Sequence, residues 1–178
     1  MDHPGQHLFW ITSRAAGTSA LVLSSLSVCV GVLIGGRLMS GRGRGTDLRT
    51  LHEALSLSAI AMLLLHGFAL LGDPFLHPSL LDISVPFVGA YRPVWTGLGI
   101  LGGWGIILLG LSFYVRDRIG LTRWRVLHRF TALAWLLGVV HTIGSGTDAG
   151  SLWYLALLAL PAIPVAVTLP ARATRLTH

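Results

Sequence analysis

The sequence contains no lysine and only seven acidic residues among 178, and charged residues make up just 11% of it. A soluble domain of this size carries about a quarter charged residues. With 53% hydrophobic residues and a mean hydropathy of +0.71, the chain lacks the polar surface that a water-soluble fold requires. It is therefore predicted to be an integral membrane protein surrounded by bilayer lipid.

Cysteine is nearly absent as well. Cys29 stands alone, so there is no disulfide framework, no CxxC pair and no CxxCH motif for covalent haem attachment. The segment GRGRG at 41–45 lacks the GK[ST] ending of a phosphate-binding loop, and no glycine fingerprint marks a dinucleotide-binding domain. The loops are too short for a flavin or nicotinamide domain, so any such domain is expected on a separate protein.

What the sequence does contain is a series of long hydrophobic stretches. A hydrocarbon core about 30 Å thick takes roughly 20 helical residues at about 1.5 Å each. Five stretches meet this length, at residues 15–36, 51–71, 93–115, 127–146 and 151–169. The alternation typical of barrel strands is absent, so we expect an all-α bundle of five membrane helices, with residues 1–178 as one domain.

The ends of these stretches carry two further signals. No basic segment precedes the first stretch, which is therefore expected to stay in the mature protein rather than be cleaved as a signal peptide. Pro161 and Pro164 predict a kink or an early end in the last stretch.

Arginine supplies all thirteen basic side chains, and its distribution predicts the topology. The links after the first and third stretches each carry four arginines and one aspartate; these arginines are Arg37, Arg42, Arg44, Arg49, Arg116, Arg118, Arg123 and Arg125. Such positive links stay on the cytoplasmic side. We expect a multi-pass protein of the bacterial cell membrane, with its N-terminus outside and its C-terminus in the cytoplasm. This asymmetry explains the net charge of +6 without nucleic-acid binding.

Four histidines lie inside the stretches at matched positions. His66 follows His52 at an interval of fourteen on the second stretch, and His141 follows His128 at an interval of thirteen on the fourth. Both stretches start from the cytoplasmic side, so the two helices are parallel and their histidines form two levels about 20 Å apart. We expect His52 beside His128 near the inner surface, and His66 beside His141 near the outer surface.

Helical phase fits one of these helices better than the other. An interval of fourteen returns His66 to within about 40° of His52, whereas an interval of thirteen leaves His141 about 140° from His128 on a straight helix. The fourth stretch is therefore expected to bend, to bulge or to meet its ligands differently, and Gly138 is the expected place for a distortion.

Facing imidazoles in a dry interior suit haem iron, which takes axial histidine on both faces. Zinc fits less well, because two histidines fill half of its tetrahedral shell and the one acid beside a pair is Glu53, at the membrane edge. Two alternatives stay open. One is a cytochrome b561-like quinol or superoxide oxidoreductase, and the other is a haem-free, histidine-based metal or proton carrier, although no carboxylate lies deep inside a stretch.

The spacing of the histidines resembles that of the ferric reductase-like transmembrane domain. The segments that carry this resemblance are LHEALSLSAIAMLLLHGFALLGDPF, VPFVGAYRPVWTGLGI and WRVLHRFTALAWLLGVVHTIGSGTD. The family includes NADPH oxidases, ferric reductases and the bacterial haem subunit that supplies electrons to a periplasmic methionine sulfoxide reductase. The chain looks most like small stand-alone actinobacterial members, over about residues 8–155.

The resemblance implies two b-type haems, an inner one held by His52 and His128 and an outer one held by His66 and His141. It implies a membrane cytochrome that carries electrons from a separate flavoprotein or quinol to an acceptor on the other side, namely ferric iron, oxygen or a partner's flavin. An FMN-binding partner protein is implied too.

Two further positions compare with the oxidase branch of the family. An arginine beside the outer haem in that branch is matched by Arg14, whereas a histidine one turn beyond the outer ligand is replaced by Leu70. The replacement disfavours a dedicated superoxide-forming site. The apolar link at 72–92 is expected to cover the outer haem as a flap or to dock a partner, and an ordinary connecting loop is the alternative.

Haem propionates are anionic, so arginines near the membrane surfaces can pair with them. The candidates are Arg49, Arg125 and Arg129 at the inner level, and Arg14 and Arg92 at the outer level. Snorkelling and topology signalling are the competing explanation for each of them.

Overall fold

The computed structural model describes residues 7–36, 44–146 and 150–159. These residues form helices and connecting turns, with no strand among them. Four segments in this part of the chain are long and apolar enough to cross a membrane: Leu8–Gly36, Gly45–Leu70, Pro93–Ile119 and Leu121–Ser145. The expected all-α membrane bundle is confirmed. Its first helix begins at Leu8, earlier than the predicted residue 15.

The fifth expected span, 151–169, is described only in its first half, where α8 (Leu152–Ala159) begins it. The remainder, which includes Pro161 and Pro164 and the kink expected there, lies outside the described residues.

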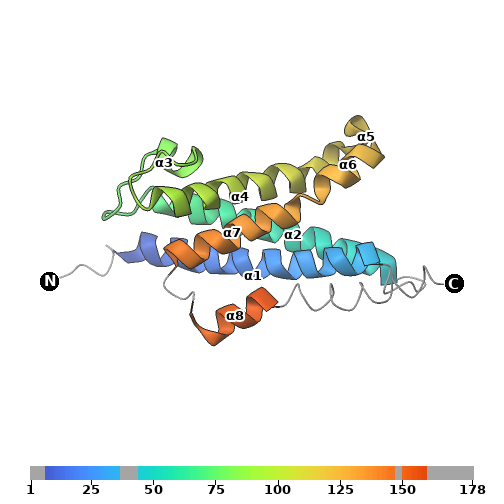
Figure 1. The fold of residues 1–178 in the computed structure, drawn as a ribbon, viewed down its shortest axis with the longest axis horizontal. Helices are drawn as coiled ribbons and strands as arrows, with labels where there is room; N and C mark the ends of the chain where they lie inside the picture. The colour runs from blue at the N-terminus through green and yellow to red at the C-terminus, as the bar shows by residue number, and fades with distance from the viewer. Residues whose placement is uncertain (1–6, 37–43, 147–149, 160–178) are drawn as a thin grey trace.

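Two helix pairs run along the long axis of the bundle (Figure 1). α1 (Leu8–Gly36) packs along α2 (Arg44–Leu70), and α4 (Pro93–Leu111) packs along α7 (Thr131–Ser145). These two pairs together form the frame in which the histidines lie.

Small residues bring α4 and α7 together. A Cβ added to Gly102 would lie 2.7 Å from the carbonyl oxygen of Ala134 and 2.9 Å from the backbone nitrogen of Gly138. Close backbone approach is a usual means of packing membrane helices, because lipid gives apolar side chains no reason to associate with each other. Large apolar side chains such as Leu108 and Leu136 are instead exposed, as expected of a surface that faces lipid.

The link between α2 and α4 contains a short helix that the sequence reading missed, α3 (Leu80–Ser84). The hydroxyl of Ser79 accepts from the N–H of Asp82 (3.3 Å), and the carboxylate of Asp82 accepts from the N–H of Ser79 (2.8 Å), which forms a capping box. The backbone N–H of Ser79, and then its hydroxyl, hold the pKa of the exposed Asp82 carboxyl below its usual value. The indole N–H of Trp104 donates to the carbonyl of Ser84 (2.8 Å) and fastens α3 to α4.

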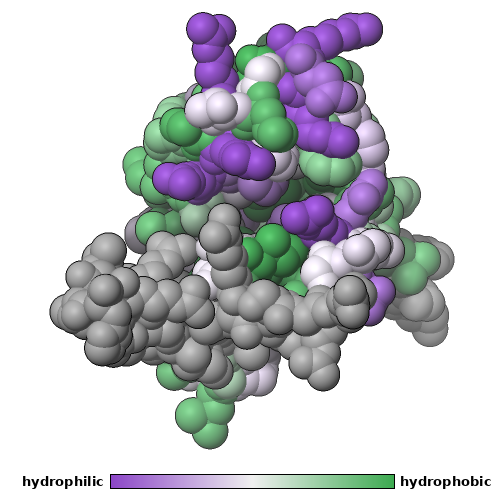
Figure 2. Space-filling model, turned by 90° about the vertical axis from the view of Figure 1, so that its right-hand side faces the viewer, coloured by the Kyte–Doolittle hydropathy of each residue, from purple (hydrophilic) through white to green (hydrophobic). Residues whose placement is uncertain are grey.

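A helical hairpin forms the opposite end of the bundle from α3. α4 tightens into the 3₁₀ turn η2 (Ser112–Val115), continues as α5 (Arg116–Ile119) and turns at Gly120 into α6 (Leu121–His128). Gly120 has a φ of 90°, which glycine adopts without a Cβ penalty. Figure 2 looks onto this end and shows hydrophilic side chains gathered there. Its exposed arginines include Arg118, Arg123, Arg125 and Arg129. We call the two ends of the bundle the α3 end and the α5 end.

The fourth span is interrupted, as helical phase required, but the place predicted for the interruption was wrong. α7 runs unbroken through Gly138, and the break lies just after His128, between α6 and α7. There the N–H groups of Arg129 and Phe130 donate to carbonyls three residues back, at 3.3 and 3.0 Å. Such 3₁₀ bonds advance the chain about 120° per residue instead of about 100°. This overwinding supplies part of the rotation that His141 needs to face the same way as His128.

Candidate functional site

The structure brings the four span histidines together as two pairs. The rings of His52 and His128 have their centres 6.0 Å apart, and those of His66 and His141 have theirs 6.4 Å apart. Since His66 follows His52 at an interval of fourteen on α2, the two levels are separated by about 21 Å of helical rise. The pairing expected from the spacing is therefore present. We call these pairs the α5-end pair (His52 and His128) and the α3-end pair (His66 and His141).

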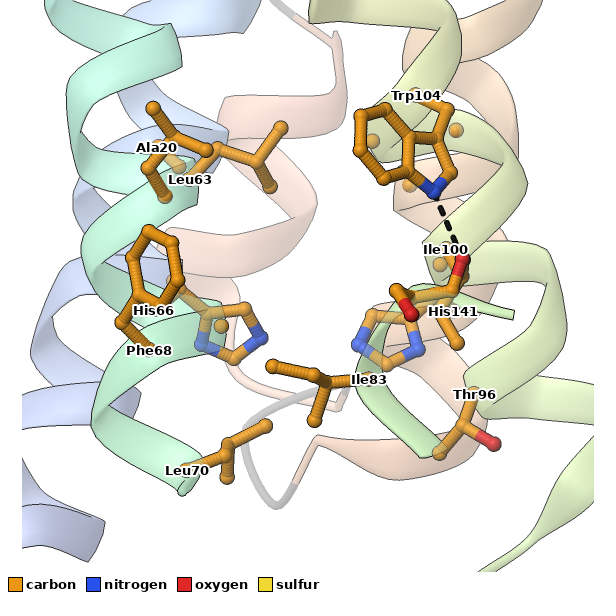
Figure 3. A pocket seen from close by; sticks show the side chains of 18 of the residues that line it. Ala20, Leu63, His66, Phe68, Leu70, Ile83, Thr96, Ile100, Trp104 and His141 are labelled. Carbon is orange, nitrogen blue, oxygen red and sulfur yellow. Dashed lines mark hydrogen bonds between the residues drawn. The ribbon is translucent and has the colours of Figure 1, made fainter. Parts of the chain in front are cut away.

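These separations match two imidazoles that share one metal ion. Two metal–nitrogen bonds of about 2 Å, with about 1 Å from each nitrogen to its ring centre, give about 6 Å between ring centres. The planes of the rings are inclined by 86° in the α5-end pair and by 66° in the α3-end pair. Figure 3 shows His66 and His141 on opposite walls of a pocket, each with a ring nitrogen turned toward the other.

Hydrogen bonds fix which nitrogen faces inward in three of the four rings. The Nδ1–H of His66 donates to the carbonyl oxygen of Ser13 (2.8 Å), and the Nδ1–H of His52 donates to that of Ser27 (3.0 Å). In the α3-end pair, the Nδ1–H of His141 donates to the carbonyl oxygen of Trp95 (2.9 Å). A proton on Nδ1 leaves the lone pair of Nε2 free for a metal, and this arrangement is usual for metal-binding histidine.

Each of these three histidines also rests against a glycine one turn beyond the residue whose carbonyl it bonds. A Cβ on Gly17 would lie 2.9 Å from Nδ1 of His66, and one on Gly31 would lie 3.2 Å from Cε1 of His52. One on Gly99 would lie 2.6 Å from Nδ1 of His141. We call this arrangement, a carbonyl acceptor followed one helical turn later by a glycine, a cradle. The glycine leaves the space that the ring needs in order to lie flat against the neighbouring helix.

The fourth histidine has an incomplete cradle. Leu109 and Phe113 follow Trp95 and Gly99 at the interval that separates the histidines of α2, so phenylalanine occupies the place of the glycine. Nδ1 of His128 is buried and makes no well-aligned hydrogen bond: the carbonyl of Leu109 lies beside it but accepts from the hydroxyl of Ser112 (2.6 Å).

A cavity of about 770 Å³ surrounds the α3-end pair. This volume lies within the range of about 300–1,000 Å³ found for sites of small molecules and cofactors. Its walls are mostly apolar, and they include Leu63, Trp104 and Trp135. The link from α2 to α4 lines it as well, and Ile83 of α3 points between the two imidazoles (Figure 3). The link therefore covers the cavity at the α3 end, where the sequence predicted either a flap or a docking surface.

The donor set at both levels fits haem iron. Within the described residues, no group of three or more histidine, cysteine, aspartate or glutamate side chains comes together that could hold a metal ion. A tetrahedral ion would require further protein ligands, whereas iron in a porphyrin needs only one axial histidine on each face. At the α3-end pair, the inward Nε2 atoms, the glycine contacts and the apolar cavity all suit such a group. At the α5-end pair, the separation of the two rings and the glycine contact of His52 suit it.

Two of the five candidate arginines, Arg14 and Arg92, lie near the α3-end pair. Arg14 follows Ser13 on α1, and its guanidinium lies 5.3 Å from the ring centre of Trp10. Arg92 donates to the carbonyl of Gly144, one turn beyond His141. Toward the α5 end, three exposed arginines flank the histidines in sequence: Arg49, Arg125 and Arg129. Pairing with propionates stays a prediction for all five.

The sequence reading missed the residues that hold the histidines. Ser13 with Gly17 and Ser27 with Gly31 form the segments SRAAG and SVCVG on α1. The interval from Ser13 to Ser27 equals the interval from His52 to His66 on the antiparallel α2. The repeat could have been found by searching the other spans for the interval that separates the histidines.

Comparison with known families identifies the kind of protein that this site belongs to. Residues 16–139 match the family described as ferric reductase like transmembrane component. The match covers more than half of the chain and includes His52, His66 and His128, and the protein belongs to this family. It is accordingly a membrane redox component, and domains of this family generally bind haem. No curated protein and no solved structure matches the chain.

Proposed function

We propose that the chain is a di-haem b-type cytochrome that carries electrons across the cell membrane. One observation carries the proposal: two histidine pairs, with ring centres 6.0 and 6.4 Å apart, are stacked through the same bundle of membrane helices. His52 and His128 would hold one haem, and His66 and His141 would hold the other. Haem iron supplies a reversible one-electron couple when bound.

The protein's own part in this function is to bind, to orient and to exclude water. The cradles leave Nε2 free on three of the four histidines and fix the direction in which each of those rings points. If both histidines of a pair held one haem iron, they would leave no coordination position for a substrate, so the arrangement would suit electron transfer better than binding of a substrate to the metal. The apolar lining of the cavity keeps water away from the α3-end pair.

The charge at the α5 end supports an orientation. The exposed arginines there favour the cytoplasmic side, so we place the α3 end outside. Membership of the family supports a separate redox partner. We propose that this partner is a flavoprotein or a quinol, and that the acceptor on the other side is ferric iron, oxygen or the flavin of a partner protein.

The absorbance of the purified protein tests the proposal. We expect the Soret and α bands of a low-spin b-type haem on reduction, and a haem-to-chain ratio of two. His66→Ala should remove one haem and His52→Ala the other. His7→Ala, at an exposed histidine outside the spans, serves as the control and should keep both.

Three results would count against the proposal. A folded but colourless protein would favour a haem-free histidine carrier. A ratio of one would remove one of the two pairs from the assignment. Retention of both haems in His66→Ala would disprove the ligand assigned at the α3 end.

A further inference from the structure

We propose that Ser13 and Ser27 of α1 are positioning residues that set the reduction potentials of the two haems separately, each through the imidazole that it contacts. This inference rests on the proposed function, because it assumes that haem is bound at both levels. It concerns the serine hydroxyls, which contribute a contact beyond the backbone carbonyls of the cradles.

At the α3-end pair, one serine closes a ring of hydrogen bonds around its histidine. The hydroxyl oxygen of Ser13 lies 3.0 Å from Nδ1 of His66, and the same hydroxyl donates to the backbone carbonyl of His66 (3.0 Å). Because the hydroxyl proton is used on that carbonyl, its oxygen accepts from Nδ1–H. The Nδ1–H of His66 is therefore shared between the hydroxyl and the carbonyl of one residue, in a three-centre bond.

At the α5-end pair, the same ring has one more member. The hydroxyl oxygen of Ser27 lies 3.1 Å from Nδ1 of His52 and 2.8 Å from the hydroxyl of Ser56. Ser56 in turn donates to the backbone carbonyl of His52 (2.7 Å), so the direction of the chain is fixed. Ser27 therefore accepts from Nδ1–H and donates to Ser56, and the ring closes on the histidine from which it started.

The two rings repeat each other along the helices. Ser56 follows His52 by four residues, and Leu70 follows His66 by the same interval. Leu70 therefore occupies, at the α3-end pair, the position that Ser56 has at the α5-end pair. Since leucine has no hydroxyl, the ring at His66 needs only Ser13. Both serines of α1 are buried, with 2% of Ser13 and 6% of Ser27 exposed, so water does not compete for these bonds.

The hydrogen bond at Nδ1 reaches the metal through the imidazole ring. An acceptor on Nδ1–H makes the ring a stronger electron donor through Nε2. A stronger donor stabilises ferric iron more than ferrous iron and lowers the reduction potential, one of the levers by which a protein tunes haem. Loss of one acceptor should therefore raise the potential of the haem at that level only.

A purely structural role predicts a different result. Serine hydroxyls often join membrane helices, so their removal could simply loosen the contact between α1 and α2. Looser packing would change stability or haem content without singling out the potential of one haem. Level-specific shifts in potential therefore separate the two roles.

The experiment is an equilibrium redox titration of the purified holoprotein, followed at the α band, with each haem assigned from His66→Ala and His52→Ala. Ser13→Ala should raise the midpoint potential of only the haem that His66→Ala removes, and Ser27→Ala only that of the other. Thr18→Val is the matched control, because the Thr18 hydroxyl donates within α1 to the carbonyl of Arg14. It should shift neither haem.

Each remaining outcome is decisive. Two bound haems with unshifted potentials in both alanine variants would overturn the inference and leave the proposed function intact, as would equal shifts of both haems in each variant. A wild-type protein without haem would remove the proposed function itself. If an alanine variant loses haem, loss at its own level alone supports positioning, and loss at both levels contradicts it. Ser13→Cys and Ser27→Cys, with a weaker acceptor of similar shape, should then shift their own haem in the same direction by less.

Discussion

The indole of Trp124 stacks on the imidazole of His128, with ring centres 5.0 Å apart and planes inclined by 26°. Its N–H donates to the hydroxyl of Ser112 (3.1 Å), which ties the indole to the end of α4. Among the described residues, His128 is also the one span histidine whose Nδ1 makes no well-aligned hydrogen bond. Stacking therefore takes over, at this position, the orienting role that a carbonyl acceptor has at the other three.

Removal of the stack should make His128 a looser ligand. In Trp124→Ala the imidazole keeps neither this stack nor an Nδ1 bond, so exogenous carbon monoxide should displace it from ferrous haem. We expect a severalfold larger CO-bound fraction than in the wild type, measured by reduced-plus-CO minus reduced spectra. Trp124→Phe retains an aromatic face and should stay near the wild type. Equal CO binding in all three proteins would show that the stack does not hold the ligand.

The two haems should differ in reduction potential, with the higher potential at the α5-end pair. The imidazole of His128 makes no well-aligned hydrogen bond at Nδ1 and so donates less electron density, whereas both members of the α3-end pair make one. Arginines at the α5 end add positive charge, which favours the ferrous state. A redox titration of the wild type should resolve two components. In His66→Ala only the α5-end haem should remain, and its midpoint potential should match the higher of the two wild-type potentials. A match with the lower potential would contradict this prediction.

The sequence predicted the histidine pairs because helical rise converts spacing into depth. Nearly equal intervals on two parallel helices place His52 level with His128, and His66 level with His141, whatever the side-chain packing. The family and the membrane-helix architecture follow from the same regularities of spacing and hydropathy.

The break in the fourth span could not be located in this way. Gly138 was the expected place because glycine weakens a helix locally, yet α7 is regular there. No glycine or proline stands at the interruption, which lies at Arg129 and Phe130. The interruption is set by tertiary packing, because His128 and His141 must both face α2. Thr131 accommodates it, since its hydroxyl donates to the carbonyl of His128 (2.5 Å).

The cradles were missed for a different reason. Small residues in a membrane span are ordinarily assigned to helix packing, so Ser13, Gly17, Ser27 and Gly31 carry no signal one at a time. Only their common interval with the histidines on α2 distinguishes them. By contrast, α3 could have been found locally, because Ser79 and Asp82 have the spacing of a capping box.

Glycine in a cradle should be required, and glycine elsewhere on the same helix should not. Gly17→Ala would place a Cβ 2.9 Å from Nδ1 of His66 and push the imidazole out of position. We expect haem content to fall from two to about one per chain, the α3-end haem being lost. Gly35→Ala is the matched control, because a Cβ there meets nothing within 4 Å, and it should retain both haems. Full haem content in Gly17→Ala would show that the ring does not need the space.

A contact outside the cradles should affect stability without affecting the α5-end haem. Ser25 is fully buried on α1, and its hydroxyl accepts from the indole N–H of Trp135 on α7 (3.0 Å). Ser25→Ala leaves that N–H without a partner and should lower the free energy of unfolding by about 1 kcal/mol. Unfolding in mixed detergent micelles, followed by circular dichroism, measures the loss. The Ser25 hydroxyl bonds no histidine, and the midpoint potential of the α5-end haem, whose histidines Trp135 does not accompany in the cavity wall, should stay at its wild-type value. A shift in the potential of the α5-end haem would mean that α1 influences the haems through general packing, and the separate roles assigned to Ser13 and Ser27 would then lose their basis.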